Sequence, residues 1–340
     1  MKILTFGEIM LRLQPFGYKR FMQAEAYEAV YGGGEANVAV SLAQLGADAA
    51  FITRLPENAI ADKCIKELRG WGVDTSRILR GGDRMGIYFC EKGAGVRASN
   101  VIYDRAHSAI SEITPQDIDC SRLLGGAGWL HFTGITPALG ENVAAATLKM
   151  VKAAKERGMI VSCDLNYRAK LWSREQAGKV MRELLKYVDV LISNEEDCKD
   201  VLGLTAEGSD ITGGHLSAEA YGKLGGRVMA MFPNIKYAAF TLRESISASQ
   251  NNWSAVLVTD KEVYRSKKYH LDIVDRVGGG DSFGAGLIYA LSSGEDGQYA
   301  VDFAVAASAI KHTVEGDFNV LSAGEVKKLM GGDASGRVQR

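Results

Sequence analysis

The chain has 340 residues, 46% of them hydrophobic and 24% charged, and its 40 Lys and Arg nearly balance its 41 Asp and Glu. This composition is that of a globular protein, and a net charge of −1 excludes bulk attraction to nucleic acid or an anionic membrane. No apolar run is long enough to span a bilayer, and Glu8 and Arg12 interrupt the first apolar segment, unlike a signal peptide. The scattered cysteines contain no C-x-x-C pair, so we expect reduced thiols and a cytoplasmic protein.

Strand-like and helical segments alternate along most of the chain. Hydrophobic periodicity predicts strands over residues 2–8, 49–54, 159–164, 188–193 and 236–242, and helices over residues 35–45, 61–71, 142–156, 195–202 and 297–312. Repeated strand-then-helix units favour a mostly parallel sheet with helices on both faces, so we predict the α/β class.

One region breaks this alternation. Residues 85–91 and 96–105 are strand-like and flank Lys92-Gly93-Ala94-Gly95, a pattern typical of a β-hairpin. Residues 11–31 also lack a helical period. Together these segments predict a small β-sheet apart from the main one.

No linker or low-complexity segment divides the chain. We therefore predict a single domain over residues 1–325, with a small β lid from about residues 11–31 and 84–107. The tail at residues 331–340 contains Gly, Asp and Ser and is expected to be frayed.

Three consecutive glycines lead into an aspartate in the run Asp275-Arg276-Val277-Gly278-Gly279-Gly280-Asp281-Ser282-Phe283-Gly284. A helix that begins at such glycines presents unpaired backbone N–H groups, which favour a phosphate. A carboxylate there repels the phosphate, so its use is to take a proton from an attacking hydroxyl. The alternative is a tight turn capped by the aspartate, although a cap needs at most one glycine.

This run resembles the C-terminal signature of the ribokinase-like (PfkB-type) sugar kinases, D-x-x-G-[AG]-G-D-x-F-x-x-G. The segment Gly32-Gly33-Gly34-Glu35-Ala36-Asn37-Val38-Ala39-Val40-Ser41-Leu42-Ala43-Gln44-Leu45-Gly46 is similar to the N-terminal signature of the same family. The resemblance extends from Lys2 to about Asn319. It implies a doubly wound, mostly parallel sheet with a small β-sheet lid, and a homo-oligomer formed through that lid. The chain has no P-loop and no dinucleotide fingerprint after its first strand.

The resemblance implies roles for both signatures. Asp281 would be the general base, and the backbone N–H groups of Gly278, Gly279 and Gly280 would stabilise the transferring phosphoryl group. Gly33, Gly34 and Asn37 would bind the sugar; the bland alternative is a glycine-rich turn with Asn37 facing solvent. Asp275 either caps its own turn or acts directly, and both interpretations stay open.

Two arginines indicate an acidic substrate. Tyr88, Tyr103 and Arg105 lie on the predicted hairpin, while Arg168 follows the strand at residues 159–164, whose end faces the ligand crevice in this class of sheet. Guanidinium groups bind a carboxylate bidentately, and a neutral sugar would not need them. The alternative for each arginine is a surface charge.

The segments at residues 7–13, 133–138 and 311–319 resemble the 2-keto-3-deoxygluconate kinase branch of the family. That branch implies transfer of the ATP γ-phosphate to the C6 hydroxyl of 2-dehydro-3-deoxy-D-gluconate. Asp317 matches an aspartate that contacts the substrate there. His312 lies either near the nucleotide or simply at a capped helix end.

The resemblance also implies ATP and Mg²⁺ as cofactors. Asn194 matches the first residue of the family's N-x-x-E motif, which organises Mg²⁺ and phosphate through water, but Asp197 replaces the glutamate, and Glu195 or Glu196 are the alternatives. Thr241-Leu242-Arg243 departs from the usual T-L-G, so we expect Arg243 to contact a phosphate. Asn166 and the glycines 278 and 280 complete the expected nucleotide site.

Three interpretations remain on sequence grounds. The first is a kinase of 2-dehydro-3-deoxygluconate. The second is a kinase of another substrate on the same fold: its galactonate epimer, fructose or ribose. The third is a non-catalytic sugar or nucleotide sensor, against which the intact base at Asp281 argues. In each case the expected partners are small molecules rather than nucleic acid or a membrane.

Overall fold

The protein is described here from a computed structural model, which describes residues 1–206 and 218–332. Residues 333–340, the greater part of the tail expected to be frayed, lie outside the described residues. No helix among the described residues is both long and apolar enough to cross a membrane.

The main sheet has nine strands, of which six run parallel. Its order is β14-β13-β12-β11-β10-β9-β1-β4, and β15 also pairs with β13. The parallel strands are β1 (Lys2–Phe6), β4 (Asp48–Ile52), β9 (Ala127–Thr133), β10 (Ile160–Asp164), β11 (Val190–Ser193) and β12 (Tyr237–Ser245). The antiparallel extension consists of β13 (Gln250–Val258), β14 (Val263–Arg265) and β15 (Tyr269–Asp272). The sheet therefore has the predicted parallel centre, with an antiparallel edge that the sequence patterns did not indicate.

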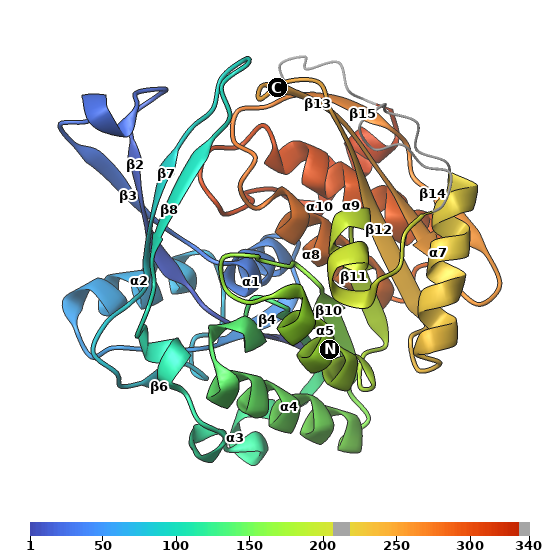
Figure 1. The fold of residues 1–340 in the computed structure, drawn as a ribbon, viewed down its shortest axis with the longest axis horizontal. Coiled ribbons are helices and arrows are strands. Elements are labelled where there is room, and N and C mark those ends of the chain that lie inside the picture. The colour runs from blue at the N-terminus through green and yellow to red at the C-terminus, as the bar shows by residue number, and fades with distance from the viewer. Residues whose placement is uncertain (207–217, 333–340) are drawn as a thin grey trace.

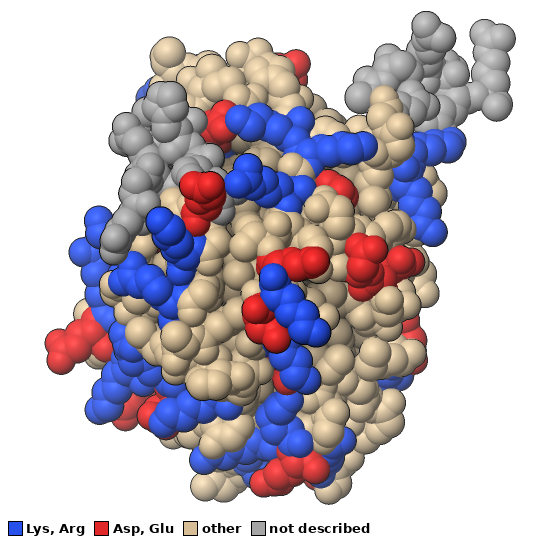
Figure 2. Space-filling view, turned by 90° about the vertical axis from the view of Figure 1, so that its right-hand side faces the viewer, with Lys and Arg blue, Asp and Glu red and all other residues tan. Residues whose placement is uncertain are grey.

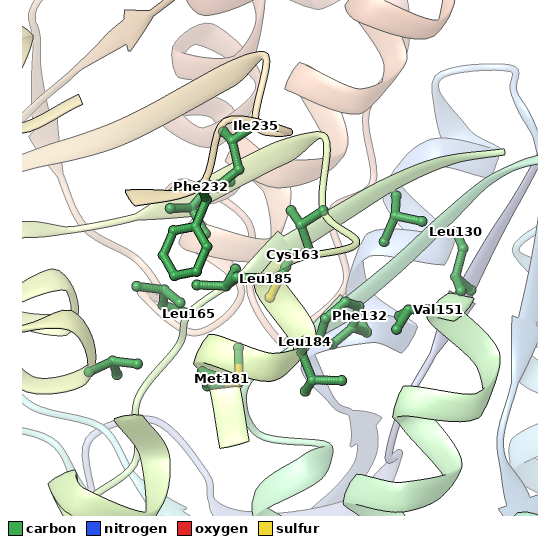
Figure 3. Close-up of a cluster of buried hydrophobic side chains, with 14 of the residues drawn as sticks. Leu130, Phe132, Val151, Cys163, Leu165, Met181, Leu184, Leu185, Phe232 and Ile235 are labelled. Carbon is green, nitrogen blue, oxygen red and sulfur yellow. The ribbon is translucent and has the colours of Figure 1, made fainter. Parts of the chain in front are cut away.

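Helices cover both faces of this sheet because its buried strands are apolar on both sides. One face packs on α1 (Gly34–Gln44), α8 (Gly279–Ser292), α9 (Gly297–Lys311) and α10 (Ala323–Met330). The other face packs on α3 (Cys120–Leu124), α4 (Glu141–Glu156), α5 (Arg174–Leu185) and α7 (Ala218–Met231). Figure 3 shows the second core, in which Leu130 and Phe132 of β9 lie near Val151 of α4. The predicted doubly wound α/β fold is confirmed.

Shorter elements complete the body. Helix α2 (Ala59–Gly70) packs with α1, and β5 (Arg54–Leu55) pairs with β6 (Leu79–Arg80). The segment predicted as one helix after β11 is a single turn, α6 (Glu195–Asp197), followed by a π-helical turn over Cys198–Leu202. Short 3₁₀ turns occur at Phe21–Gln23, Ala109–Glu112, Pro115–Asp117 and Pro137–Leu139.

A separate four-stranded sheet forms the predicted lid. Its order is β3-β2-β7-β8, built from β2 (Met10–Pro15), β3 (Tyr27–Gly32), β7 (Ile87–Glu91) and β8 (Asn100–Asp104). Figure 1 shows this sheet projecting from the body at the left of the view. The tip of the β7–β8 hairpin touches the body, since the N–H of Ala248 donates to the carbonyl of Gly95 over 2.8 Å. The lid is therefore closed against the β12–β13 turn.

The surface carries both signs of charge. Figure 2 shows Lys and Arg side chains interspersed with Asp and Glu over the face at the right of Figure 1. This mixture agrees with the nearly neutral composition.

Candidate active site

A cleft of about 560 Å³ lies where the main sheet, the lid and the beginning of α8 meet. The carboxyl ends of β10 and β11 point into it, as the geometry of open parallel sheets requires. Most residues that the sequence analysis proposed for a site line this one cleft: Gly33, Gly34, Asn37, Tyr88, Tyr103, Arg105, Asn166, Arg168, Asn194, Glu196, Asp197, Thr241, Arg243, Gly278, Gly279, Gly280, Asp281 and Asp317. Asp275 and His312, for which a role in the site was one of two interpretations, do not line it. The fold thus brings together residues from the whole length of the chain.

The glycine run forms the N-terminus of α8, and packing explains two of its three glycines. Gly278 has a φ of +82°, and a Cβ there would lie 2.3 Å from the carbonyl oxygen of Asp317. A Cβ at Gly279 would lie 2.6 Å from the His312 ring, whereas one at Gly280 would meet nothing within 4 Å. The first two glycines are therefore required by neighbouring atoms, and the third leaves open space in the cleft.

The backbone N–H groups at this helix start are only partly used. The N–H of Gly279 donates to the carbonyl of Arg276 over 3.3 Å. Within the described ranges, the N–H groups of Gly278, Gly280 and Asp281 have no protein acceptor. Together with the helix dipole, these free donors can bind an anion.

Asp281 is half-buried in the first turn of α8, and Asn37 of α1 holds it. The Asn37 side-chain amide donates to Asp281 Oδ2 over 2.7 Å, and its oxygen accepts from the N–H of Gly33 over 3.3 Å. Burial, partly opposed by this hydrogen bond, raises the pKa of the Asp281 carboxyl to about 6. Asn37 thereby connects the first glycine-rich segment to the second and orients the carboxylate.

Gly34 keeps the space in front of this carboxylate open. A Cβ at Gly34 would lie 3.5 Å from Asp281 Oδ1 and 3.4 Å from the methyl carbon of Thr133. A hydroxyl that enters the gap therefore comes within hydrogen-bonding reach of Asp281.

Glu35, next to Gly34, is buried and fixes the beginning of α1. Its Oε1 accepts from the Thr133 N–H (2.9 Å), the Thr133 hydroxyl (2.8 Å) and the Thr136 hydroxyl (2.6 Å). Burial raises the pKa of the Glu35 carboxyl to about 7.

Two further carboxylates, Asp164 and Asp197, line the cleft. Burial, and then the charges of Asp197 and Asp281, raise the pKa of the Asp164 carboxyl well above its ordinary value. Asn194 caps α6, because its side chain accepts from the Asp197 N–H (2.8 Å) and donates to Asp197 Oδ2 (2.9 Å). In the described part of the chain, no group of three or more acidic, His or Cys side chains is arranged to hold a metal directly. Repelling carboxylates of this kind fit a hydrated divalent cation held mainly through water.

The two arginines proposed to recognise an acid have different environments. Arg105 donates from Nε to Glu8 Oε2 over 2.9 Å and pairs with the same oxygen through Nη2, so its charge is already balanced. Arg168 is exposed, donates to the carbonyl of Tyr167 over 2.9 Å, and makes no ion pair with any described residue. Arg168 is therefore the freer cation for a substrate carboxylate.

Asp317 lies deeper than a simple substrate ligand. Its Oδ2 accepts from the Tyr88 hydroxyl over 2.5 Å, and its Oδ1 accepts from Arg12 over 2.6 Å. Exposed Arg243 and half-buried Arg276 also line the cleft. His312 ends α9, with Nδ1 2.7 Å from the Ser308 carbonyl, and does not line the cleft, which agrees with the helix-end interpretation.

Sequence reasoning missed several residues of this site. Asp164 is the last residue of β10, and parallel strands of this class of sheet end at the ligand crevice. This rule could have identified Asp164 from the sequence. Glu8 follows β1 in the same way. Arg12 carries no local signal, because an arginine in a strand next to a turn normally faces solvent.

Comparison with known proteins identifies the family of the chain. Residues 1–220 and 249–323 match the model of the pfkB family carbohydrate kinases. The chain is 32% identical to a 2-dehydro-3-deoxygalactonokinase of Haloferax volcanii over 98% of each chain. It is 29% identical to a 2-dehydro-3-deoxygluconokinase of Thermoproteus tenax over 97% of this chain and 94% of the relative. A crystal structure of 2-dehydro-3-deoxygluconokinase from Thermotoga maritima matches with 51% identity and a TM-score of 0.93, over 97% of this chain and 99% of that one.

Free N–H groups at a helix N-terminus and an adjacent carboxylate are groups that phosphoryl transfer to an alcohol can use. The chain belongs to the pfkB family of carbohydrate kinases, and it is a sugar kinase that uses ATP.

Proposed function

We propose that this kinase transfers the γ-phosphate of ATP to the C6 hydroxyl of 2-dehydro-3-deoxy-D-gluconate. The observation that carries the proposal is the placement of Asp281 beside the free N–H groups of the α8 N-terminus and opposite the open space at Gly34. A base and an anion site then face the same reacting hydroxyl.

In the proposed reaction, the C6 oxygen forms a bond to the γ-phosphorus as its proton passes to Asp281. The bond from that phosphorus to the β–γ bridging oxygen breaks, and ADP leaves with the oxygen. The backbone N–H groups of Gly278, Gly279 and Gly280 would stabilise the charge that develops on the phosphoryl oxygens. The N–H of Gly279 would contribute the weakest of these three contacts, because it already donates to the carbonyl of Arg276.

The carboxylates Asp164 and Asp197, with Glu196, would hold hydrated Mg²⁺, and Asn194 would keep Asp197 in place. When bound, Mg²⁺ neutralises charge on the ATP phosphates. Thr241, Arg243 and Asn166 also line the cleft and are the proposed contacts to the nucleotide.

The identity of the sugar acid rests on Arg168 and on the relatives. Its exposed guanidinium lines the cleft and forms no ion pair with a described carboxylate, so it is available to an acidic substrate. Tyr88, Tyr103 and Arg105 of the lid also line the cleft, and Gly33, Asn37 and Asp317 complete the proposed pocket. The Haloferax volcanii relative favours a second candidate substrate, the galactonate epimer.

The decisive experiment is ADP release with Mg-ATP and a panel of 2-dehydro-3-deoxygluconate, its galactonate epimer, gluconate, fructose and ribose. We expect turnover confined to the two 2-dehydro-3-deoxy acids, with the gluconate epimer preferred. Turnover on fructose or ribose alone would overturn the acid assignment and leave the kinase assignment standing.

A further inference from the structure

Arg12 is a lid residue buried against the body. It belongs to β2, its side chain has 0% exposure, and it spans two segments distant in sequence. Nη2 lies 2.8 Å from Asp275 Oδ2, and Nη1 lies 2.6 Å from Asp317 Oδ1. A single guanidinium therefore joins the lid to two segments of the body, one at Asp275 and one at Asp317.

Both carboxylates are held further by the protein. Asp275 accepts from the N–H groups of Val277 (3.1 Å) and Gly316 (3.2 Å), which fixes the loop just before the glycine run. Asp317 accepts from Tyr88 of β7, and its backbone carbonyl lies against Gly278. Asp275 thus links Arg12 to the loop that precedes the anion-binding loop (residues 278–281). Asp317 links Arg12 to Gly278, the first residue of the anion-binding loop.

Burying the charges of Arg12, Asp275 and Asp317 together costs desolvation free energy. Burial lowers the pKa of the Arg12 guanidinium, but the charges of Asp317 and Asp275 outweigh it and raise the pKa above its ordinary value. An apolar side chain of similar size would avoid this desolvation, so a buried ion triad is better explained by the conformation it specifies than by stability.

We propose that Arg12 is a positioning residue that joins the closed lid to the anion-binding loop, so that lid seating and the orientation of residues 278–281 are set together. This inference rests on the proposed function of that loop. Neither the sequence motifs nor the relatives assign a role to Arg12. Its effect on the reaction passes through Asp275 and Asp317, because Arg12 itself does not line the cleft.

The network also has an electrostatic consequence for the base. The titratable groups whose charges act on Arg12 or Asp281, or on which these two act, are Asp275, Asp317, Tyr88, Cys90, Lys311, Arg168 and Asp164. The charge of Asp317 already raises the pKa of the Asp281 carboxyl, whereas Lys311 and Arg168 lower it. Removing Arg12 leaves Asp317 and Asp275 less compensated, so the pKa of Asp281 should rise further.

The test compares Arg12→Met, Arg12→Lys and the double variant Arg12→Met/Asp317→Asn, using the best substrate of the wild-type enzyme. The matched control is Arg97→Met, because Arg97 also pairs with a carboxylate, Glu91 (2.9 Å), but entirely within the lid.

For Arg12→Met we expect kcat to fall by about 10²-fold, the cost of a misplaced reacting group. The acid limb of its kcat/KM profile should move to higher pH, and the double variant should move it back. Arg12→Lys should retain the position of the limb but only part of kcat.

A second readout does not depend on turnover. Hydrogen exchange of the full chain should become faster both in β2 and β7 and at residues 275–281 in Arg12→Met, and only near the hairpin tip in Arg97→Met. Faster exchange in the lid alone, or an unmoved acid limb with wild-type kcat, would overturn the proposal. If Arg12→Met does not fold, Arg12→Lys decides by the other two readouts: wild-type kcat, or faster exchange in the lid alone, would overturn the proposal. Wild-type enzyme without turnover on any substrate would instead refute the proposed function, while hydrogen exchange still tests the coupling.

Discussion

Asp281 combines two properties that a general base needs at the scale of one residue. It faces open space at Gly34, and burial raises the pKa of its carboxyl to about 6. The base works only when ionised, so we expect kcat/KM to fall as the pH drops through about 6 rather than near 4. A pH profile of the wild-type enzyme checks this, and an acid limb below pH 5 would contradict it.

The raised pKa of Asp281 also determines how the stability of the protein changes with pH. An unfolded aspartate titrates near about 3.9, so the folded state binds the proton more tightly and loses stability as the pH rises from there to about 6. At neutral pH Asp281→Asn should therefore raise the melting temperature while lowering kcat by about 10²- to 10⁴-fold. Thermal unfolding and ADP release on one preparation separate these effects, and near-normal turnover in this variant would exclude Asp281 as the base.

Arg168 tests the substrate at the same scale. Arg168→Met removes an exposed cation from the cleft, and the loss of a charge-assisted hydrogen bond should raise KM for the sugar acid by about 10- to 100-fold. The matched control is Arg174→Met, because Arg174 is exposed, pairs with Asp200 (2.8 Å) and lies outside the cleft. Equal KM values for both variants would mean that Arg168 is only a surface charge.

At the scale of elements, the reaction depends on how α8 begins. Gly280→Ala adds a methyl group that would meet no neighbouring atom within 4 Å. The free energy of unfolding should therefore be unchanged or raised by up to about 1 kcal/mol. The methyl group would occupy part of the proposed phosphate site, so kcat should fall. Gly226→Ala is the control, since Gly226 is an exposed position of α7 with equally open surroundings. Urea unfolding and kcat of both variants check this; an active Gly280→Ala enzyme would place the phosphate elsewhere.

For the whole molecule, the question is whether lid and body unfold together. Among the described residues, the buried apolar cluster centred on the lid strands consists of Met10, Tyr88 and Cys90, too few to stabilise a sheet alone. We therefore expect a single transition. Tryptophan fluorescence reports only the body, because the four tryptophans Trp71, Trp129, Trp172 and Trp253 lie outside the lid strands, whereas far-UV circular dichroism reports both. Coincident urea curves would support the single domain proposed over residues 1–325, and an earlier dichroism transition would refute it.

Local patterns in the sequence were sufficient for much of this fold. Hydrophobic periodicity located five of the six parallel strands and the hairpin, because burial on one or both sides leaves a regular repeat in the chain. It missed the parallel strand β9 in the middle of the sheet. It did not predict β13, which pairs antiparallel with β12 and carries the polar residues Asn251 and Asn252 among its apolar ones. The single turn of α6 and its π-helical continuation also escaped, since a helical repeat does not show where the hydrogen-bond pattern changes.

By itself, the sequence determined the class of chemistry, because three glycines before Asp281 constrain a backbone and a base within a few residues of one another. Only the tertiary structure decided which charges remain available. Arg105 is balanced by Glu8, 97 residues away, and Asp317 by Arg12, 305 residues away. A repeat in the chain reports which face of an element is buried, whereas the partner across that face depends on how the elements pack, and so the roles of Arg12, Arg105 and Asp317 could be read only from the folded molecule.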